Sequence, residues 1–241
     1  MPAASGSAPP FPPPPPVLLI LGTDAVGKDH VADFLIQRWE ALGHRVEKRA
    51  GSFSEVVADK RSSSDRKGAL GRAMELLFLT FFPLLRPLLA IVLPLMIRRD
   101  IRRFQRPDHP VLIVSHTALR LLAFSEAWRP SKSGNPRPSV TALARELAET
   151  GATFLMLTLA PSIREQRIQR RVDNLTSDPF DRLMVRDPQL ANRFQQQFMT
   201  LAVNSLGARV IENNDLDPDA LERELIRAMQ IMTVNSTTPI A

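Results

Sequence analysis

Residues 17–35 read VLLILGTDAVGKDHVADFL, and they decide the fold because they join an apolar run, a turn with two glycines and the start of a helix. Such an apolar run is typical of a strand that is buried on both faces. Four residues separate Gly22 from the pair Gly27 and Lys28, which is the spacing of a Walker A loop up to its lysine. Backbone N–H groups in such a turn point at phosphate oxygens, and the following helix adds the positive end of its dipole. The stretch therefore predicts a phosphate-binding loop.

Asp29 departs from this motif, because a serine or threonine normally follows the lysine. A hydroxyl there binds Mg²⁺ as a neutral ligand, whereas a carboxylate binds the ion more strongly but places negative charge beside the phosphates. Two interpretations stay open: Asp29 is a metal ligand, or it only stabilises the first helical turn, as acidic residues do in any helix. The predicted nucleotide contacts of this stretch are Gly22, Thr23, Asp24, Ala25, Val26, Gly27, Lys28, Asp29 and His30.

The composition suits a single α/β domain, since 241 residues can bury one sizeable core but are too few for two full enzymes unless both are small. The net charge of +6 would suit an anionic partner, although arginines scattered through helices more often form a solvated face. No recognition-helix or RNA-binding signature accompanies this charge, so we expect no nucleic-acid partner. The absence of cysteine excludes a disulfide framework and thiolate-bound zinc, and it fits the reducing cytoplasm.

Short β-rich runs alternate with helical patterns along the chain, which indicates βαβ units around a parallel sheet. The predicted strands are Val17–Leu21, Arg45–Lys48, Val111–Ser115, Thr153–Leu159 and Arg209–Ile211. The first, third and fourth are apolar enough to be central, so the other two are expected at the edges. The sequence thus predicts an α/β three-layer sandwich with a five-stranded parallel sheet, which is a P-loop NTPase fold.

Several helix ends are predicted from their capping residues. Gly43 follows an amphipathic pattern and predicts a C-terminal cap. Asp187 and Asp217 each precede a proline, which predicts an N-cap side chain followed by a first helical turn. Ser162 and Glu165 have the spacing of a capping box.

Both ends of the chain are predicted to be flexible. Residues 1–16, MPAASGSAPPFPPPPP, lack the basic start and apolar centre of a secretory signal, so we expect a disordered, proline-rich tail that stiffens into polyproline II. We interpret this tail as a spacer rather than as a ligand for an SH3-like partner. The folded domain is predicted to span residues 17–232, which leaves residues 233–241 as a flexible C-terminus.

Residues 76–97, LLFLTFFPLLRPLLAIVLPLMI, are the most apolar segment, and RRDIRR follows them. The length approaches that of a membrane-spanning helix, but Arg86 and three prolines lie inside the segment, so a simple span is disfavoured. Two interpretations stay open. Either two short helices pack into the domain, or residues 76–103 lie on a membrane surface with their basic flank against anionic lipid.

Two regions together carry a resemblance to a known family. The loop GTDAVGKD resembles that of the thymidylate kinase family of nucleoside monophosphate kinases, and residues 178–202, DPFDRLMVRDPQLANRFQQQFMTLA, look like the lid and following helix of that family. The matching residues are Asp181, Arg182, Arg193, Phe198, Leu201 and Ala202, with Pro161, Arg167 and Arg171 in the preceding helix.

The resemblance covers about residues 17–230 and implies ATP on the loop, Mg²⁺, a lid over residues 173–187 and an acceptor held across a cleft. By position it implies that Asp24 faces the acceptor. It also implies that Asn213, in the turn after the last strand, lies on the adenine side and contacts the nucleotide. Arg49 is a looser match to an arginine after the second strand.

The resemblance breaks at the end of the third strand. The family has an Asp-Arg-aromatic triplet there, whereas this chain has Ser115, His116 and Thr117. Three interpretations stay open: the metal-side chemistry is lost, Asp29 holds the metal instead, or Ser115 and His116 simply cap the next helix.

We therefore expect an ATP-dependent phosphotransferase of the thymidylate kinase type, with a nucleotide-like or other small-molecule acceptor. The predicted catalytic residues are Lys28, which grips the phosphates, and Arg182 and Arg186, which cover the transferred group from the lid. Asp29 is the predicted Mg²⁺ ligand. The alternative is a non-catalytic or regulatory ATP-binding protein peripheral to a membrane. A cytoplasmic location is expected, with membrane association and a homodimer left open.

Overall fold

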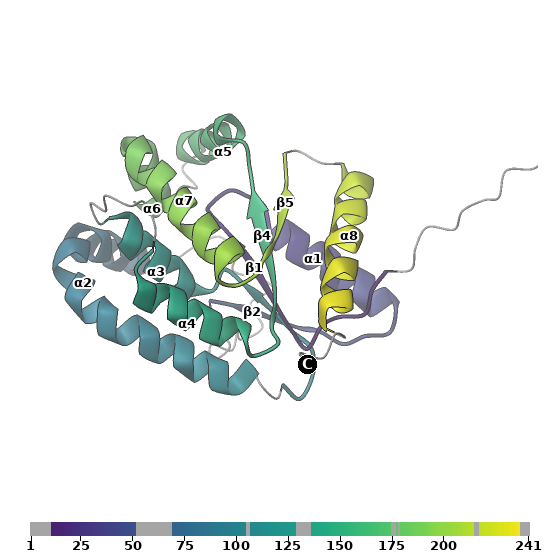
Figure 1. The fold of residues 1–241 in the computed structure, drawn as a ribbon. Helices are drawn as coiled ribbons and strands as arrows, with labels where there is room; N and C mark the ends of the chain where they lie inside the picture. The colour runs from purple at the N-terminus through teal and green to yellow at the C-terminus, as the bar shows by residue number, and fades with distance from the viewer. Residues whose placement is uncertain are drawn as a thin grey trace, which may run out of the picture.

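The computed structural model describes residues 11–51, 69–104, 107–128, 136–174, 177, 179–214 and 217–236 of the chain, in which strands alternate with helices (Figure 1). The elements are β1 (Val17–Gly22), α1 (Lys28–Ala41), β2 (Glu47–Ala50), α2 (Ala69–Phe104), β3 (Val111–Val114), α3 (Thr117–Ala127), α4 (Pro138–Ala148), β4 (Thr153–Thr158), α5 (Pro161–Asp173), α6 (Pro179–Arg186), α7 (Pro188–Asn204), β5 (Arg209–Glu212) and α8 (Pro218–Ser236).

The five strands form one parallel sheet in the order β2-β3-β1-β4-β5. The three strands predicted to be central, β1, β3 and β4, do lie inside the sheet. Leu19 of β1 pairs with Ile113 of β3 on one side and with Phe154 of β4 on the other. Helices α1 and α8 cover one face, while α3, α4 and α7 cover the other and α2 packs outside them (Figure 1). The prediction of a three-layer α/β sandwich with a five-stranded parallel sheet is confirmed.

Strand β1 contributes to both hydrophobic cores, because its side chains alternate between the two faces of the sheet. Leu19 and Leu21 pack with α2, α3 and α7, whereas Leu18 and Ile20 pack with α1 and α8. All four side chains are buried. The turn that follows β1 therefore starts from a strand that cannot shift without disturbing both cores.

An aromatic cluster joins the helices on the α2 side of the sheet. Phe124 of α3 lies at its centre, with ring centroids 4.6 Å from Phe82 of α2, 5.0 Å from Phe180 of α6 and 5.7 Å from Phe194 of α7. Trp128 adds a further ring at 5.6 Å. Four helices thus share one close-packed group of rings, which offset and edge-on geometry stabilises.

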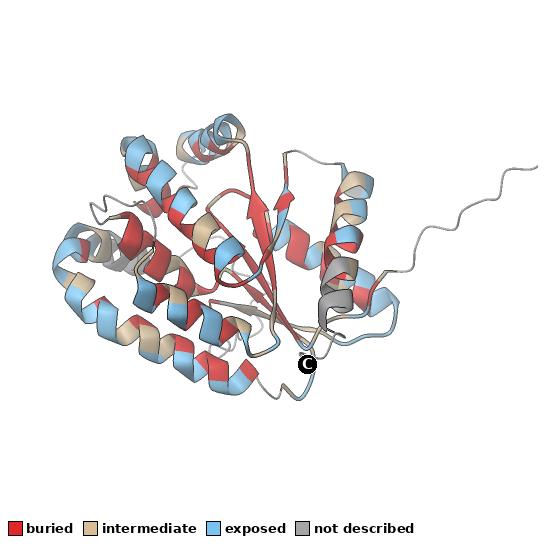
Figure 2. Cartoon of the chain, viewed as in Figure 1, coloured by how far each residue is buried: buried red, intermediate tan, exposed pale blue. Residues whose placement is uncertain are grey.

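Helix α2 is one continuous helix of 36 residues, so the interpretation as two short helices is wrong. The prolines at 83, 87 and 94 were the reason to expect a break, but they lie inside the helix. Residues 77–104 are long and apolar enough to cross a bilayer, with a mean hydropathy of 2.0, yet only 22% of the most apolar window is buried. Figure 2 shows exposed residues in pale blue along the outer side of α2.

The folded chain extends beyond both predicted boundaries. The Trp39 indole N–H donates to the Pro12 carbonyl at 3.0 Å, and the Phe11 ring packs edge-on against Trp39, so residues 11–16 belong to the fold rather than to a disordered tail. At the other end α8 continues to Ser236, so residues 233–236 are helical. Residues 1–10 and 237–241 lie outside the described part of the chain.

Most of the predicted helix ends are present. The Asp187 side chain accepts from the Leu190 N–H at 2.9 Å, and Asp217 accepts from the Ala220 N–H at 2.7 Å. Gly43 has a φ of 83° directly after α1, as a C-terminal glycine cap requires.

The capping box at Ser162 and Glu165 is wrong. The N-cap of α5 is Ala160, and Pro161 already occupies the first turn, so Ser162 lies inside the helix. The Ala160 N–H donates instead to the Asn214 side chain at 2.8 Å.

Candidate functional site

The turn between β1 and α1 lies at the carboxyl edge of the sheet, and its shape requires both glycines. Gly22 has a φ of 151°, and a Cβ there would lie 2.7 Å from Val26 Cγ2 and 2.8 Å from the Leu157 carbonyl. Gly27 has a φ of 84°, and its Cβ would lie 2.6 Å from Asn213 Nδ2. The spacing of the two glycines in the sequence therefore corresponds to a compact turn with no room for side chains at either position.

Lys28 folds back over this turn. Its ammonium donates to the carbonyls of Gly22 at 3.1 Å and Thr23 at 2.5 Å, and the residue is 8% exposed. The Lys28 pKa is lowered to about 8, chiefly by burial; Arg120 and Arg171 contribute to the lowering, while Asp24 and Asp29 oppose it. The side chain predicted to grip phosphates is therefore inside the turn and close to its titration point at neutral pH.

Asp24 joins the turn to the α2 side of the sheet. Its carboxylate accepts from Arg120 Nη2 of α3 at 2.5 Å. The same guanidinium lies over the ring of Phe180 in α6, 4.4 Å from the ring centroid. The turn, α3 and α6 thus meet at one arginine, through an ion pair and a cation–π contact.

Arg167 and Asn213 hold the other side of the turn. Arg167 of α5 donates to the Ala25 carbonyl at 3.0 Å and to the Asn213 carbonyl at 3.4 Å. The Asn213 amide donates to the Val26 carbonyl at 2.8 Å. Asn213, predicted as a nucleotide contact, therefore lies against the turn although 187 residues separate it from Val26.

Arg171 adds a further positive charge near the turn. It lies one turn along α5 from Arg167, and its charge lowers the Lys28 pKa. Its Nη1 lies 3.4 Å from a carboxylate oxygen of Asp181, which is buried at the start of α6. Of the residues that carry the family resemblance, Arg167 contacts the turn and Arg171 acts on the charge of Lys28, while Asp181 pairs with Arg171.

Asp29 and His30 are exposed on the first turn of α1. The Asp29 side chain is 82% exposed, and Lys48 Nζ of β2 lies 3.6 Å from it. Lys48 contacts Asp33 more closely, at 2.7 Å. Asp29 therefore faces solvent beside the turn, where its carboxylate is available to an approaching ion.

A preformed metal cage is not present in the described part of the chain, where no three His, Asp or Glu side chains gather closely enough to hold an ion. Mg²⁺ keeps several waters and usually takes only one or two carboxylates together with substrate phosphates. One accessible carboxylate, Asp29, next to the turn predicted to bind phosphate fits this mode of binding.

The lid arginines are not at the turn. Arg182 Nε donates to the Ser177 hydroxyl at 3.2 Å, and Arg186 is exposed at the C-terminal end of α6. Among the described residues, neither guanidinium makes a hydrogen bond or ion pair with the turn. The arginines that contact it are Arg120 and Arg167, on α3 and α5.

At the end of β3, His116 caps the next helix, which was one of the three interpretations of this segment. The His116 Nδ1 accepts from the Leu119 N–H at 3.3 Å, so His116 is the N-cap of α3. Its other ring nitrogen lies 3.1 Å from Asp100 Oδ2 of α2, and both side chains are buried. Ser115 has a φ of 58°, and its N–H donates to the Ile20 carbonyl of β1 at 3.1 Å.

Two important residues were not predicted. Arg120 carries no motif, and its partner Asp24 lies 96 residues away in the sequence. Asp100 stands within RRDIRR, which reads as a solvated basic flank. No local signal marks either residue, because each acts through a contact that only the tertiary fold creates.

A cavity of about 390 Å³ lies between α5, α6 and α7, outside the turn. Arg164 lines it and is buried, donating to Asn192 at 3.3 Å and to Gln195. Burial lowers the Arg164 pKa. Because both of its partners are amide side chains of α7, Arg164 holds α5 against α7.

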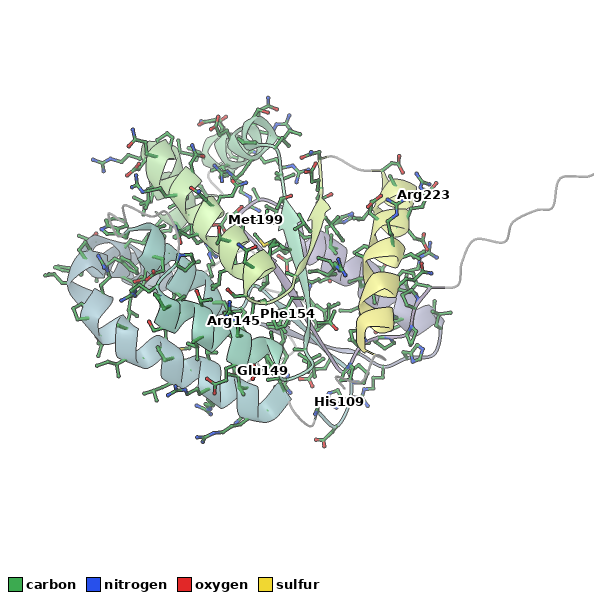
Figure 3. The ribbon with its side chains drawn as sticks, viewed as in Figure 1. His109, Arg145, Glu149, Phe154, Met199 and Arg223 are labelled. Atoms are coloured by element: carbon green, nitrogen blue, oxygen red, sulfur yellow. The ribbon has the colours of Figure 1, made fainter. Side chains whose placement is uncertain are left out.

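A separate polar cluster lies at the amino edge of the sheet, where Figure 3 labels His109. The Glu47 carboxylate accepts from Arg49 Nε at 2.7 Å and lies 2.5 Å from His109 Nε2. Hydrogen bonds from Arg49 and then from His109 lower the Glu47 pKa. Arg49, the looser match to the family, is thus engaged by Glu47 on its own strand.

Of the comparisons with known proteins, only the comparison with solved structures finds matches to this chain. No protein-family model matches the sequence, and a search of curated proteins finds no significant match. The fold is similar to that of a gluconokinase from Sinorhizobium meliloti 1021, with a TM-score of 0.46 and 13% identity over 93% of this chain and 97% of that one. It is also similar to that of thymidylate kinase from Candida albicans, with a TM-score of 0.49 and 14% identity over 92% of this chain and 93% of that one. At identities this low, nothing about a reaction follows from the likeness.

Proposed function

We propose that the chain binds ATP through residues 22–29 and transfers its γ-phosphoryl group to a small-molecule acceptor. The observation that carries this proposal is the position of Lys28. Its ammonium lies on two carbonyls of a turn that opens at the start of α1. In the complex this ammonium exchanges the two carbonyls for phosphate oxygens, and the backbone N–H groups of the turn bind the same phosphates.

The charges around the turn support an anionic ligand. Burial is the main cause of the lowered Lys28 pKa, and Arg120 and Arg171 add charge repulsion, which Asp24 and Asp29 oppose. A polyphosphate offsets this repulsion. Phosphoryl transfer needs mainly positioning and charge neutralisation, which such a group of cations supplies.

Mg²⁺ is part of the proposal, with Asp29 as the protein residue that would hold it. When bound, the ion neutralises charge on the outer phosphates. Arg182 and Arg186 are proposed to cover the transferred group from α6, which requires α6 to approach the turn from its present position. The acceptor is proposed to be nucleotide-like or another small molecule.

The second candidate is a regulatory ATP-binding protein without transfer. The observation that favours it is at the end of β3, where His116 is buried as a helix cap and Ser115 leaves the strand with a φ of 58°. No carboxylate stands there among Ser115, His116 and Thr117. Asp24, the remaining acid of the turn, is paired with Arg120.

A thermal-shift measurement with ATP, with and without Mg²⁺, tests the binding proposal. A ligand at about 100 times its Kd stabilises the folded state by about 2.7 kcal/mol. We expect this stabilisation in the wild type and its loss in Lys28→Ala. The quantity compared is the ATP-induced shift, because removing a buried lysine changes the stability of the free protein as well.

Arg38→Ala is the matched control, since Arg38 is an exposed cation on the same helix and pairs with Glu222. Its ATP-induced shift should equal that of the wild type. An unchanged shift in Lys28→Ala would remove the site assignment. Binding without transfer of labelled phosphate to any acceptor or to water would favour the regulatory candidate.

A further inference from the structure

Helix α2 carries an exposed apolar stripe that the proposed function does not use. Its members lie four and three residues apart, are each between 49% and 75% exposed, and are Leu77, Phe81, Leu84, Leu88, Ile91 and Leu95. At 3.6 residues per turn this spacing keeps all six within about 80° of one another around the helix. Scattered apolar residues are normal on protein surfaces, but a continuous stripe five turns long marks a surface that binds something.

The opposite side of α2 is already occupied by the domain. Phe82, Leu93 and Ile97 are at most 1% exposed and belong to the core shared with α3 and α4. Figure 2 shows this division, with exposed residues along the outer side of α2 and buried ones toward α3 and α4. A helix packed in this way lies along the domain, so a partner reaches only its outer face.

The stripe ends in a group of exposed cations. Arg98 and Arg102 continue the three- and four-residue spacing of the stripe beyond Leu95. Arg99 and Arg103 lie beside them on the exposed side of the helix. Over residues 77–104, for which the side chains are described, the only acidic residue is Asp100, which is buried. The outer face of α2 is therefore apolar over most of its length and cationic at its C-terminal end, where Arg98 Nε lies 3.8 Å from the Glu146 carboxylate of α4.

The combination of an apolar stripe and a cationic end indicates which kind of partner binds the outer face of α2. A second copy of the chain would bring two such faces together, and between residues 77 and 104 helix α2 itself carries no exposed acidic side chain to pair with the partner's arginines. An anionic phospholipid surface offers both parts at once, since acyl chains accept the apolar stripe and phosphate headgroups accept the arginines.

The prolines agree with a shallow position in the membrane. Each proline lacks an N–H, so the carbonyls of Leu79, Pro83 and Ala90 lose the donor that the residue four positions later normally supplies. In dry hydrocarbon such carbonyls are costly, whereas at the level of the headgroups water reaches them.

We propose that the outer face of α2 docks the protein on an anionic phospholipid surface, with the stripe at the boundary of the acyl chains and Arg98, Arg99, Arg102 and Arg103 at the phosphates. The helix lies in the plane of the surface and does not cross it. This inference goes beyond the proposed function and does not depend on nucleotide binding.

Flotation with preformed vesicles tests the proposal. We expect the full-length protein to float with vesicles of phosphatidylcholine mixed with phosphatidylglycerol, to bind far less to phosphatidylcholine alone, and to be released by high salt. Leu88→Gln combined with Ile91→Gln should weaken binding to the mixed vesicles by on the order of tenfold per residue. Arg99→Gln combined with Arg103→Gln should weaken it by about fivefold per residue, and only with the anionic vesicles.

Matched controls exist elsewhere on the surface. Leu42→Gln changes a leucine that is 54% exposed, close to the 56% of Leu88, but at the C-terminal cap of α1. Arg223→Gln removes an exposed arginine of α8, which Figure 3 labels on the side of the molecule away from α2. Both controls should bind vesicles as the wild type does.

Three outcomes would overturn the proposal. The first is absence of the wild type from the floating fraction. The second is a loss of vesicle binding that is equally large in the α2 variants and in the control variants. The third is a stable dimer in lipid-free light scattering that the Leu88 and Ile91 changes convert to monomer without any effect on vesicles, because a second copy would then cover the stripe. The ATP-induced thermal shift, measured on the same samples, reports separately on the phosphate-binding turn.

Discussion

Single residues of the turn show how far its chemistry follows from local sequence. The spacing of Gly22, Gly27 and Lys28 predicted a phosphate-binding loop, and the structure has a compact turn there with the lysine folded over its carbonyls. Spacing is informative there because the positions of the two glycines and the lysine are set within one short local turn. Arg120 could not be predicted in this way, since its role depends on Asp24 arriving from another element.

The pH dependence of ATP affinity is a first prediction. Burial lowers the Lys28 pKa to about 8, and a bound polyphosphate favours the charged ammonium, so the pKa rises in the complex. Above pH 8 binding therefore takes up a proton, and affinity should fall by up to about tenfold per pH unit. Titration calorimetry between pH 7 and pH 10 measures this. Lys28→Arg, which stays charged, should show a flat profile, and a flat wild-type profile would contradict the assigned role of the lysine.

A second prediction concerns Gly27→Ala. The residue has a φ of 84°, and the new Cβ would lie 2.6 Å from Asn213 Nδ2. The left-handed backbone alone costs about 1–2 kcal/mol, and displacement of Asn213 adds to this cost and opens the turn. We expect lower stability toward denaturant and a smaller ATP-induced shift.

Gly43→Ala separates the two effects. Gly43 has nearly the same φ, 83°, but nothing lies within 4 Å of its Cβ position. The Gly43→Ala variant should therefore lose only the stability that the left-handed backbone costs, and its ATP-induced thermal shift should equal that of the wild type. Equal losses in both variants would mean that the contact with Asn213 has no consequence.

At the scale of elements, the helices and strands followed from periodicity and caps, and the errors came from tertiary contacts. Helix α2 continues through Pro83, Pro87 and Pro94, because packing of Phe82, Leu93 and Ile97 against the domain outweighs the local cost of the prolines. Residues 11–16 were expected to be free because their anchor, Trp39, lies on another element.

The buried contact between α2 and the end of β3 gives a third prediction. Asp100→Ala leaves the His116 ring nitrogen without the oxygen now 3.1 Å away, in a site that water does not reach. The free energy of unfolding should fall by about 2 kcal/mol, measured by chemical denaturation. Glu224→Ala removes a pair whose side chains are 69% and 42% exposed and should change stability by less than about 0.5 kcal/mol. A similar decrease in the free energy of unfolding in both variants would show that the buried contact stabilises the fold no more than an exposed ion pair does.

At the scale of the whole molecule, the order of the sheet could be predicted in outline. The three most apolar runs had to be central because parallel strands are covered on both faces, and β1, β3 and β4 are. The placement of Asp100, Arg120 and the lid could not be predicted, since it depends on how α2, α3 and α6 pack around one aromatic cluster.

The N-terminal segment gives a fourth prediction at this scale. Phe11 packs edge-on against Trp39 at 6.2 Å between ring centroids, far from the turn and on the α1 side of the sheet. Phe11→Ala should reduce the free energy of unfolding by about 1 kcal/mol or more and leave ATP affinity unchanged. Leu42→Ala, an exposed change at the end of α1, should have little effect on either. Unaltered stability in Phe11→Ala would place residues 11–16 outside the cooperative unit.

The ring of Phe124 has a consequence for motion. Because it touches Phe82, Phe180, Phe194 and Trp128, α6 is held to the body of the protein by an interlocked packing and not by a loose hinge. Swinging α6 toward a substrate requires several aromatic side chains to reorient together, which places such a rearrangement among collective transitions of microseconds to milliseconds. The rate at which the molecule opens and closes would then be set by the interior of the protein and not by its surface loops.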